Sequence, residues 1–292
     1  IQEGDSVKWD VSYQNLSKYK SDSVHVYYTL TKPDRSTVTT KAGKIEEMAA
    51  GANTIYKLKI PTLGLAGNNL LKLDFTPING NDSYTFNNFI QQSFNVTRDN
   101  KEPIVDVAFD GKHIMNGEIV SPQPNIMVNL SDENSFILLK DTTVMNILLK
   151  SETGSYKRIA YTSGMLEFTP ANSATNNKAS VAYKPSKLAD GIYTLMVEAK
   201  DASGNINSAN NYTIDFEVIN ESAITHFYPY PNPFTTAMKF VFTLTGDKIP
   251  DKIKVQIMTV TGKIVREVFK EELGNIRIGN NISDFTWDGT DM

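Results

Sequence analysis

Cysteine is absent from this chain of 292 residues. Its absence excludes disulfide bonds, a thiolate nucleophile and zinc sites built on cysteine. A secreted bacterial protein without disulfides fits this composition, and so does a cytosolic protein. The missing cysteine therefore does not decide the compartment.

Long hydrophobic runs and clusters of positive charge are missing too. The longest apolar stretches fall far short of the roughly 18 to 20 residues that span a bilayer, so we expect no transmembrane segment. The formal net charge is −4 and Lys and Arg are scattered, so nucleic acid is not an expected partner. The chain begins at Ile1 and shows no signal peptide, and we expect it to be a processed or excised piece of a longer protein.

Catalytic residue patterns are also lacking. The three histidines, His25, His113 and His226, are too far apart in sequence for a two-histidine metal spacing, and we interpret His25 and His226 as solvated. No G-x-S-x-G sequence occurs. Asp215 and Glu217 share one face of a predicted strand, as the acid pair of a glycosidase requires, but a solvated strand face is the favoured interpretation. We predict no catalytic residue and no cofactor, and keep a hydrolase of unrecognised mechanism as a third hypothesis.

Helical periodicity is missing as well, because no such segment reaches the roughly 12 residues of a stable helix. Apolar residues instead alternate with polar ones over short stretches, as in residues 7–13, 24–30 and 71–75. Turn-forming residues separate these stretches at intervals of roughly 8 to 12 residues. The pattern predicts an all-β chain of tandem immunoglobulin-like β-sandwich domains, and 40% hydrophobic residues suffice for a core in each.

Two breaks divide the chain into three predicted modules. The polar stretch at 99–103 ends in proline and is the first boundary. The prolines of YPYPNPF, residues 228–234, predict a stiff connector that enters no sheet centre, because proline fixes φ and lacks a backbone donor. We name residues 1–99, 103–220 and 221–292 the first, second and third modules.

The first module resembles the adhesion-like sandwich modules of prokaryotic surface proteins, which are related to the CARDB type. The resemblance rests on the stretch EGDSVKWDVSYQNLSKYKSDSVHVYYTL, residues 3–30, in which a polar YQNLS turn separates the first two strands.

A more specific resemblance covers residues 103–292. It rests on VDVAFDGKHIMNGEIVSPQPNIMVNLSDENSF, DGIYTLMVEAKDASGN, FEVIN, YPYPNPF, FTLTG, IMTVTGKIVRE, ELG, RIGNN and WDGTD. These motifs resemble the C-terminal half of large secreted Bacteroidota proteins of the gingipain-like cysteine peptidase family, the group that contains the type IX secretion sortase. The stretch from Tyr228 also resembles the immunoglobulin-like module of the flagellar hook-capping protein.

The resemblance implies an extracytoplasmic chain, secreted or at the outer cell surface, whose β-modules follow a peptidase domain. Because the family nucleophile is a cysteine, none of its functional residues can be assigned here, and we expect this chain not to be an enzyme. Its expected role is to space or dock the peptidase domain, with its own upstream peptidase domain or cell-surface and secretion proteins as partners. The family pattern continues beyond WDG.D with a final strand, whereas this chain stops at Met292. We therefore expect a truncated third module with an open sheet edge.

Two oxygen-rich loops are the candidate calcium sites. Asp132 and Glu133 lie in one loop, and Asp201 and Asn205 lie in the other. Ca²⁺ prefers several carboxylate and carbonyl oxygens. The competing interpretation, which we favour, is turn chemistry, in which these side chains bond their own backbone and Gly204 supplies a positive φ.

An alternative function of another class is a glycan- or adhesin-type binding module. Such a module stacks sugars on exposed aromatic rings, whereas packing in the core is the favoured interpretation of the aromatic residues here. The candidate rings are those of Trp9, Tyr27, Tyr28, Tyr56, Tyr84, Tyr161 and Trp287.

Overall fold

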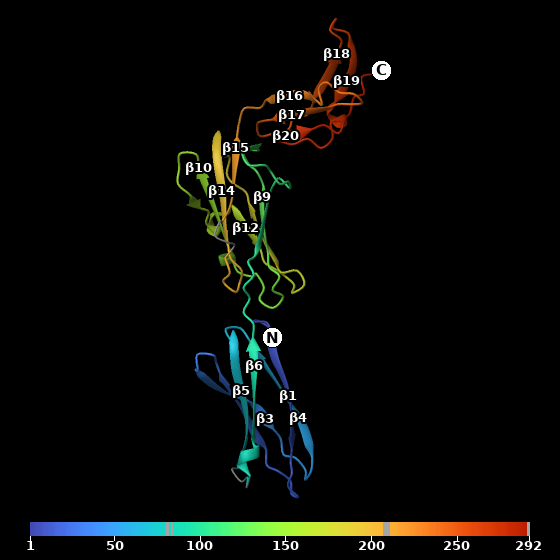
Figure 1. The fold of residues 1–292 in the computed structure, drawn as a ribbon. Coiled ribbons are helices and arrows are strands. Elements are labelled where there is room, and N and C mark those ends of the chain that lie inside the picture. The colour runs from blue at the N-terminus through green and yellow to red at the C-terminus, as the bar shows by residue number, and fades with distance from the viewer. Residues whose placement is uncertain (80–81, 83, 207–210, 291–292) are drawn as a thin grey trace. The chain divides into compact units, whose positions relative to one another are not determined.

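The computed structural model describes residues 1–79, 82, 84–206 and 211–290, and these form an all-β chain. Within these ranges, strands are joined by loops and by four 3₁₀ segments of three residues each, and no helix is long and apolar enough to cross a membrane. The predicted fold class is confirmed. The chain divides into two compact units, Ile1–Lys101 and Glu102–Met292 (Figure 1).

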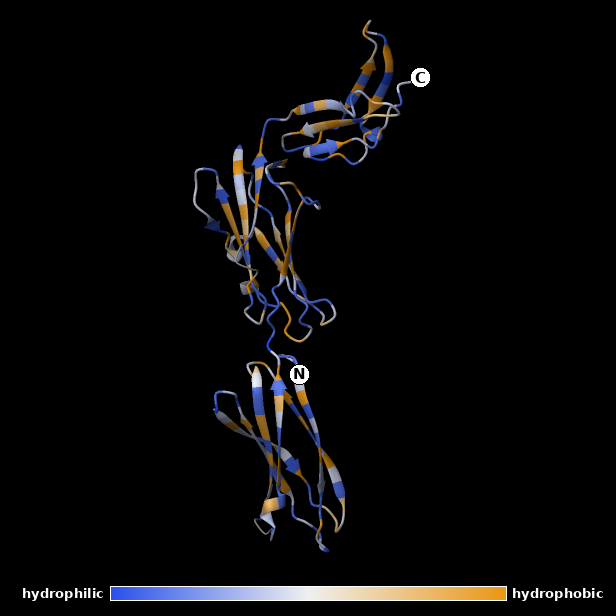
Figure 2. Cartoon of the chain, viewed as in Figure 1, coloured by the Kyte–Doolittle hydropathy of each residue, from blue (hydrophilic) through white to orange (hydrophobic). Residues whose placement is uncertain are grey.

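The first unit is a sandwich of a two-stranded sheet, in the order β1-β4, and a four-stranded sheet, in the order β3-β2-β5-β6. Its strands are β1 (Ser6–Gln14), β2 (Val24–Thr31), β3 (Thr37–Ile45), β4 (Asn53–Pro61), β5 (Gly67–Pro77) and β6 (Phe89–Val96). One core joins the two sheets, with Val11 and Ile60 on one side and Val26 and Leu73 on the other. Hydrophobic and hydrophilic residues alternate along β1, β2 and β5 (Figure 2), which turns one face of each strand toward that core.

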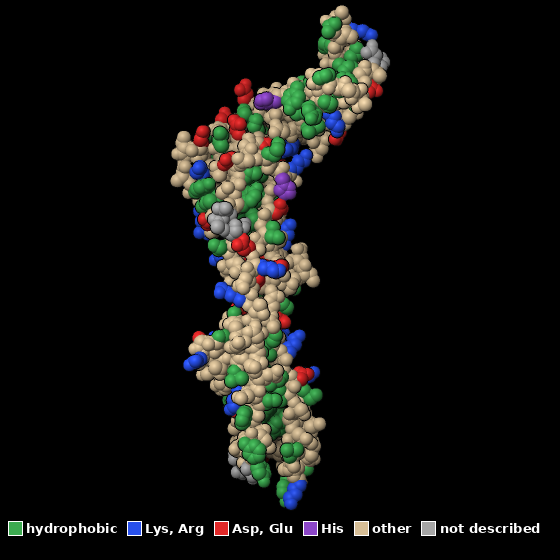
Figure 3. Space-filling model, viewed as in Figure 1, with side chains coloured by type: hydrophobic (Ala, Val, Ile, Leu, Met, Phe, Trp, Pro, Cys, Tyr) green, Lys and Arg blue, Asp and Glu red, His purple; other side chains and the backbone are tan. Residues whose placement is uncertain are grey.

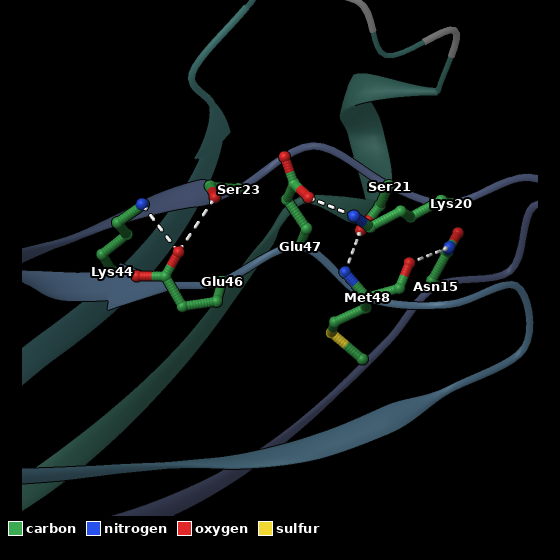
Figure 4. A network of polar contacts seen from close by, with 8 residues as sticks. All are labelled: Asn15, Lys20, Ser21, Ser23, Lys44, Glu46, Glu47 and Met48. Atoms are coloured by element: carbon green, nitrogen blue, oxygen red, sulfur yellow. Dashed lines mark hydrogen bonds and ion pairs between the residues drawn. The ribbon is translucent and has the colours of Figure 1, made fainter.

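A polar network closes one end of this sandwich (Figure 4). Asn15 is buried, and its Nδ2 donates to the carbonyls of Tyr19 at 2.8 Å, Met48 at 3.2 Å and Ala49 at 3.1 Å. Its Oδ1 accepts the amide of Ser17 at 3.0 Å. The asparagine of the YQNLS turn therefore holds two loops together, one of residues 15–23 and one of residues 46–52.

Charged and hydroxyl side chains add to the same network nearer the surface (Figure 4). Lys20 pairs with Glu47, and Glu46 accepts from Lys44 Nζ at 2.7 Å and from Ser23 Oγ at 3.2 Å. Because these pairs are solvent-exposed, they contribute little to stability, and the buried Asn15 is the energetically important member.

The second unit begins with a larger sandwich that contains the second module. A five-stranded sheet in the order β11-β10-β14-β15-β8 faces a four-stranded sheet in the order β12-β13-β9-β7. The strands are β7 (Ile104–Phe109), β8 (Glu118–Val120), β9 (Ile126–Ser131), β10 (Met145–Ser151), β11 (Lys157–Arg158), β12 (Leu166–Thr169), β13 (Lys178–Tyr183), β14 (Gly191–Ala199) and β15 (Tyr212–Val218). Phe109 and Phe216 meet in its core with ring centroids 5.2 Å apart.

The third module forms the rest of the second unit and has a separate core. Its strands are β16 (Ile224–Tyr230), β17 (Lys239–Leu244), β18 (Lys254–Met258), β19 (Ile264–Phe269) and β20 (Gly279–Ile282). β16, β17 and β20 form one sheet, and β18 and β19 form a second sheet of only two strands. Phe240, Phe242 and Leu273 are buried between them.

The backbone tests one turn and one connector that the sequence predicts. Asp110 and Gly111, with φ of 49° and 79°, form the tight turn that the Asp-Gly sequence predicts, and the residues flanking it, Phe109 and Lys112, bond each other through both amides.

The predicted connector at 228–234 is wrong in part. Tyr228–Tyr230 belong to β16, which pairs with β17, and His226 lies in the same strand rather than in a linker. Pro229 is accommodated because β16 is an edge strand, where a missing donor costs no ladder bond.

Candidate functional site

The third module contains a groove between its two sheets. Its volume is about 300 Å³, and it is lined mainly by apolar side chains of both sheets. The lining residues are Ile224, Phe227, Phe242, Ile253, Lys254, Val255, Gln256 and Leu273. Phe242 and Leu273 form a buried floor, whereas Ile224 and Phe227 are nearly half exposed.

One wall of the groove is the edge of β18. Four consecutive residues, 253–256, line the groove. Because side chains alternate between the two faces of a strand, a groove that touches consecutive residues lies against the strand edge. β18 pairs with β19 on one side and has no partner on the other among the described residues. Its unpaired backbone donors and acceptors therefore border the groove.

The opposite wall is formed by β16, which is the edge strand of its own sheet. Phe227 stacks on Phe240 with ring centroids 5.3 Å apart, yet it remains 46% exposed. Tyr228 and Tyr230 on the same strand are also exposed. Figure 3 shows hydrophobic side chains gathered on this part of the molecule, next to a histidine. Contiguous exposed apolar surface of this kind is typical of protein interaction sites.

Charged groups lie at the rim of the groove. Glu267 of β19 accepts from Gln256 Nε2 at 2.6 Å and from Lys254 Nζ at 3.0 Å. Both hydrogen bonds lower the pKa of the Glu267 carboxyl, and the bond from Gln256 has the larger effect. Lys254 is the one ionisable residue among those that line the groove, and it is engaged in this pair. The groove thus offers backbone hydrogen bonds and apolar contact, and its charged lining residue, Lys254, is already paired with Glu267.

The two predicted calcium loops meet in the second module. The carboxylates of Asp132 and Asp201 lie within 4.8 Å of each other, a proximity that sequence spacing alone does not reveal. Glu133 is exposed on the same loop as Asp132. Asp201 accepts from Asn205 twice, from its backbone amide and from its Nδ2, both at 2.7 Å.

The backbone of both loops also shows the predicted turn chemistry. Gly204 has a φ of 90°, and Asp132 accepts the amide of Asn134 at 3.1 Å. Since Ca²⁺ takes six to eight oxygen ligands, the described side chains supply only part of a coordination shell. The calcium site stays a prediction.

Most of the candidate sugar-stacking rings pack into the cores. Five of the seven, Trp9, Tyr28, Tyr56, Tyr161 and Trp287, are half-buried against core clusters. Tyr84 is 63% exposed, but its ring meets that of Phe86 edge to face, at 86°, so the two do not form a flat platform.

The histidines lie in three separate modules, and none meets a nucleophile in the contacts of the described residues. His25 is half-buried on β2 rather than solvated, with Nε2 3.4 Å from Lys41 Nζ. His113 contacts Asp106 at 2.6 Å, and Asp106 also accepts from Asn129. Both hydrogen bonds lower the pKa of the Asp106 carboxyl, and the bond with His113 has the larger effect. The pair lies at the surface and lacks the third member of a hydrolytic triad.

Neither a protein-family profile nor a curated protein matches this chain. Among solved structures, the crystal structure of dimeric latent PorU from Porphyromonas gingivalis is similar with a TM-score of 0.32 and 15% sequence identity. The match covers all of this chain and 29% of the PorU chain, so this chain spans less than a third of that protein. A match of this TM-score and identity assigns no function.

Proposed function

We propose that this chain is a non-catalytic interaction segment whose third module binds an extended strand of a partner polypeptide. The observation that carries the proposal is the apolar groove along the unpaired edge of β18. Strand addition to an exposed sheet edge is a common mode of peptide recognition, in which main-chain bonds give affinity and alternate side chains give specificity.

The geometry of the groove favours a polypeptide strand as its occupant. A backbone running along residues 254–258 pairs with the free donors and acceptors of β18, which no apolar small molecule does. Its inward-facing side chains then cover Phe242 and Leu273, while the outward-facing ones contact solvent. The volume of about 300 Å³ is at the lower limit of sites that enclose a small molecule, but it suffices for a few side chains.

The absence of cysteine and the surroundings of the histidines support a role without catalysis. The motifs between residues 105 and 291 support a secreted or cell-surface protein of the gingipain-like type, in a type IX secretion context. In that setting the modules space or dock a peptidase domain, and the strand that β18 binds belongs to that domain or to a surface or secretion protein.

Peptide selection tests this proposal. A library of random peptides of about 10 residues, the upper range of natural strands, is displayed on phage and selected on the full chain. We expect the enriched peptides to alternate apolar and polar residues. Binding is expected to be lost in the Ile224→Lys variant, which places a charge in the groove.

A matched variant controls for the substitution itself. Ile282→Lys makes the same change at an exposed position of β20, the opposite edge of the sheet that contains β16. We expect this variant to bind the selected peptides as the wild type does. No enrichment, or equal binding to Ile224→Lys, would overturn the proposal.

A further inference from the structure

A buried ion pair connects the second and third modules. Arg277 Nη2 lies 2.6 Å from Glu118 Oε1, and the Glu118 side chain is only 3% exposed. The second carboxylate oxygen of Glu118 accepts the amide of Met115 at 2.9 Å. Both oxygens of a buried carboxylate are thus paired, one within its own module and one across the junction.

The backbone next to Arg277 approaches β8 closely. Gly279 has a φ of 96°, and a Cβ at this position would lie 2.3 Å from the carbonyl oxygen of Ile119. No other residue fits without displacing one module from the other, because both the positive φ and the lack of space select glycine. The contact is therefore made by the main chains themselves.

Asn281 holds this part of the third module in position. It is buried, accepts the amide of Arg277 at 2.8 Å, and donates to the carbonyls of Arg277 and Gly279, both at 2.8 Å. Arg277 therefore reaches Glu118 from a turn whose backbone is already fixed. A pre-organised turn loses less conformational freedom when the two modules meet.

Further contacts between the two modules lie near residues 219–221, where the chain passes from the second module to the third. The amide of Gly246 donates to the carbonyl of Ile219 at 2.9 Å. Lys187 pairs with Asp247 at 3.2 Å, but both side chains are about half exposed. An exposed pair of this kind contributes little and is screened by salt, so the buried pair and the main-chain contact dominate the junction.

We infer that the second and third modules are locked into one rigid body, with Arg277, Gly279 and Glu118 as the residues that fix their relative orientation. Neighbouring modules joined by a small polar contact are ordinarily free to reorient. A buried carboxylate with both oxygens bonded opposes this, since any rotation that separates it from Arg277 leaves its charge unpaired in the interior. The groove of the third module thus keeps a fixed direction relative to the second module.

Distance measurements in the full chain test this inference, and the absence of native cysteine makes labelling specific. Spin labels are attached at Thr169→Cys in the second module and Glu271→Cys in the third, both exposed positions. Pulsed electron paramagnetic resonance then measures the distribution of distances between them. We expect one narrow distribution for the wild-type junction.

Substitutions in the junction are expected to broaden this distribution. Arg277→Met removes the cation, and Gly279→Ala forces the main chains apart. Lys187→Met is the matched control, because it removes the cation of the exposed pair. This variant is expected to keep the narrow distribution. If Arg277→Met does not fold, Glu118→Gln weakens the same pair with a smaller change, and it is then expected to broaden the distribution.

Two results would overturn the inference. A wild-type distribution as broad as that of Gly279→Ala would show that the modules reorient freely. A narrow distribution that persists in folded Arg277→Met or Glu118→Gln and in Gly279→Ala would show that other contacts hold the modules.

Discussion

Asn15 is predicted to be a principal stabilising polar residue of the first unit. Asn15→Ala removes an amide that donates to three carbonyls and accepts one backbone amide. An amide group has two hydrogens, so these contacts correspond to about three full hydrogen bonds, each worth about 1 kcal/mol. We expect the free energy of unfolding of this unit to fall by about 3 kcal/mol.

Urea denaturation measures this loss. Trp9 lies in the first unit and Trp287 in the second, so a Trp287→Phe background lets tryptophan fluorescence report the first unit. With a urea dependence of about 1–3 kcal/mol per molar, the midpoint is expected to fall by about 1–3 M.

Asn95→Ala serves as the matched control. Asn95 is exposed, and its side chain bonds only the side chain of Asn68 among the contacts of the described residues. We expect its removal to change stability by no more than about 0.5 kcal/mol. A loss below about 1 kcal/mol for Asn15→Ala would refute the role assigned to the network.

Three further predictions concern ionisation, metal and activity. Burial raises the pKa of Tyr183 to about 12, whereas the unfolded chain ionises this side chain near pH 10. The free energy of unfolding is therefore expected to fall by about 2 to 3 kcal/mol as pH rises from 10 to 12. Alkaline denaturation of Tyr183→Phe should lack this loss, and identical profiles would contradict it. Chelation by EDTA should leave the melting temperature unchanged if Asp201 is satisfied by Asn205, whereas a Ca²⁺-dependent rise abolished by Asp201→Asn would establish a metal site. Fluorogenic substrates of cysteine peptidases should not be turned over, because the chain has no cysteine, and turnover would contradict the proposed non-catalytic role.

The strand pattern was the most predictable part of the fold. Period-two alternation at residues 7–13, 24–30 and 71–75 corresponds to β1, β2 and β5. The pattern is informative because each sheet buries one face, so every second residue of a strand is apolar.

Strands without a clear apolar alternation are not predicted from the sequence. The sequence prediction does not include β3, whose residues 37–45 are mostly exposed, or β13, where small Ala179 weakens the alternation with Val181 and Tyr183. The β-branched run at 37–40 was the available signal for β3.

Contacts between distant segments were beyond the reach of sequence patterns. Glu118 and Arg277 are 159 residues apart, and neither differs locally from a surface charge. The carboxylates of Asp132 and Asp201 are brought together by loops at the ends of different sheets. The groove residues Phe227 and Leu273 are apolar like any core residue, so the sequence does not show that they lie beside the unpaired edge of β18.

Hydrogen–deuterium exchange along β18 tests the central claim most directly. The full chain is measured with and without an alternating peptide from the phage selection, at about ten times its dissociation constant. If the peptide adds a strand, exchange in residues 254–258 should slow about tenfold, because the bound fraction limits opening. Residues 279–282 of β20, on the far edge of the other sheet, should not change. Unchanged exchange along β18 in the presence of bound peptide would contradict the account.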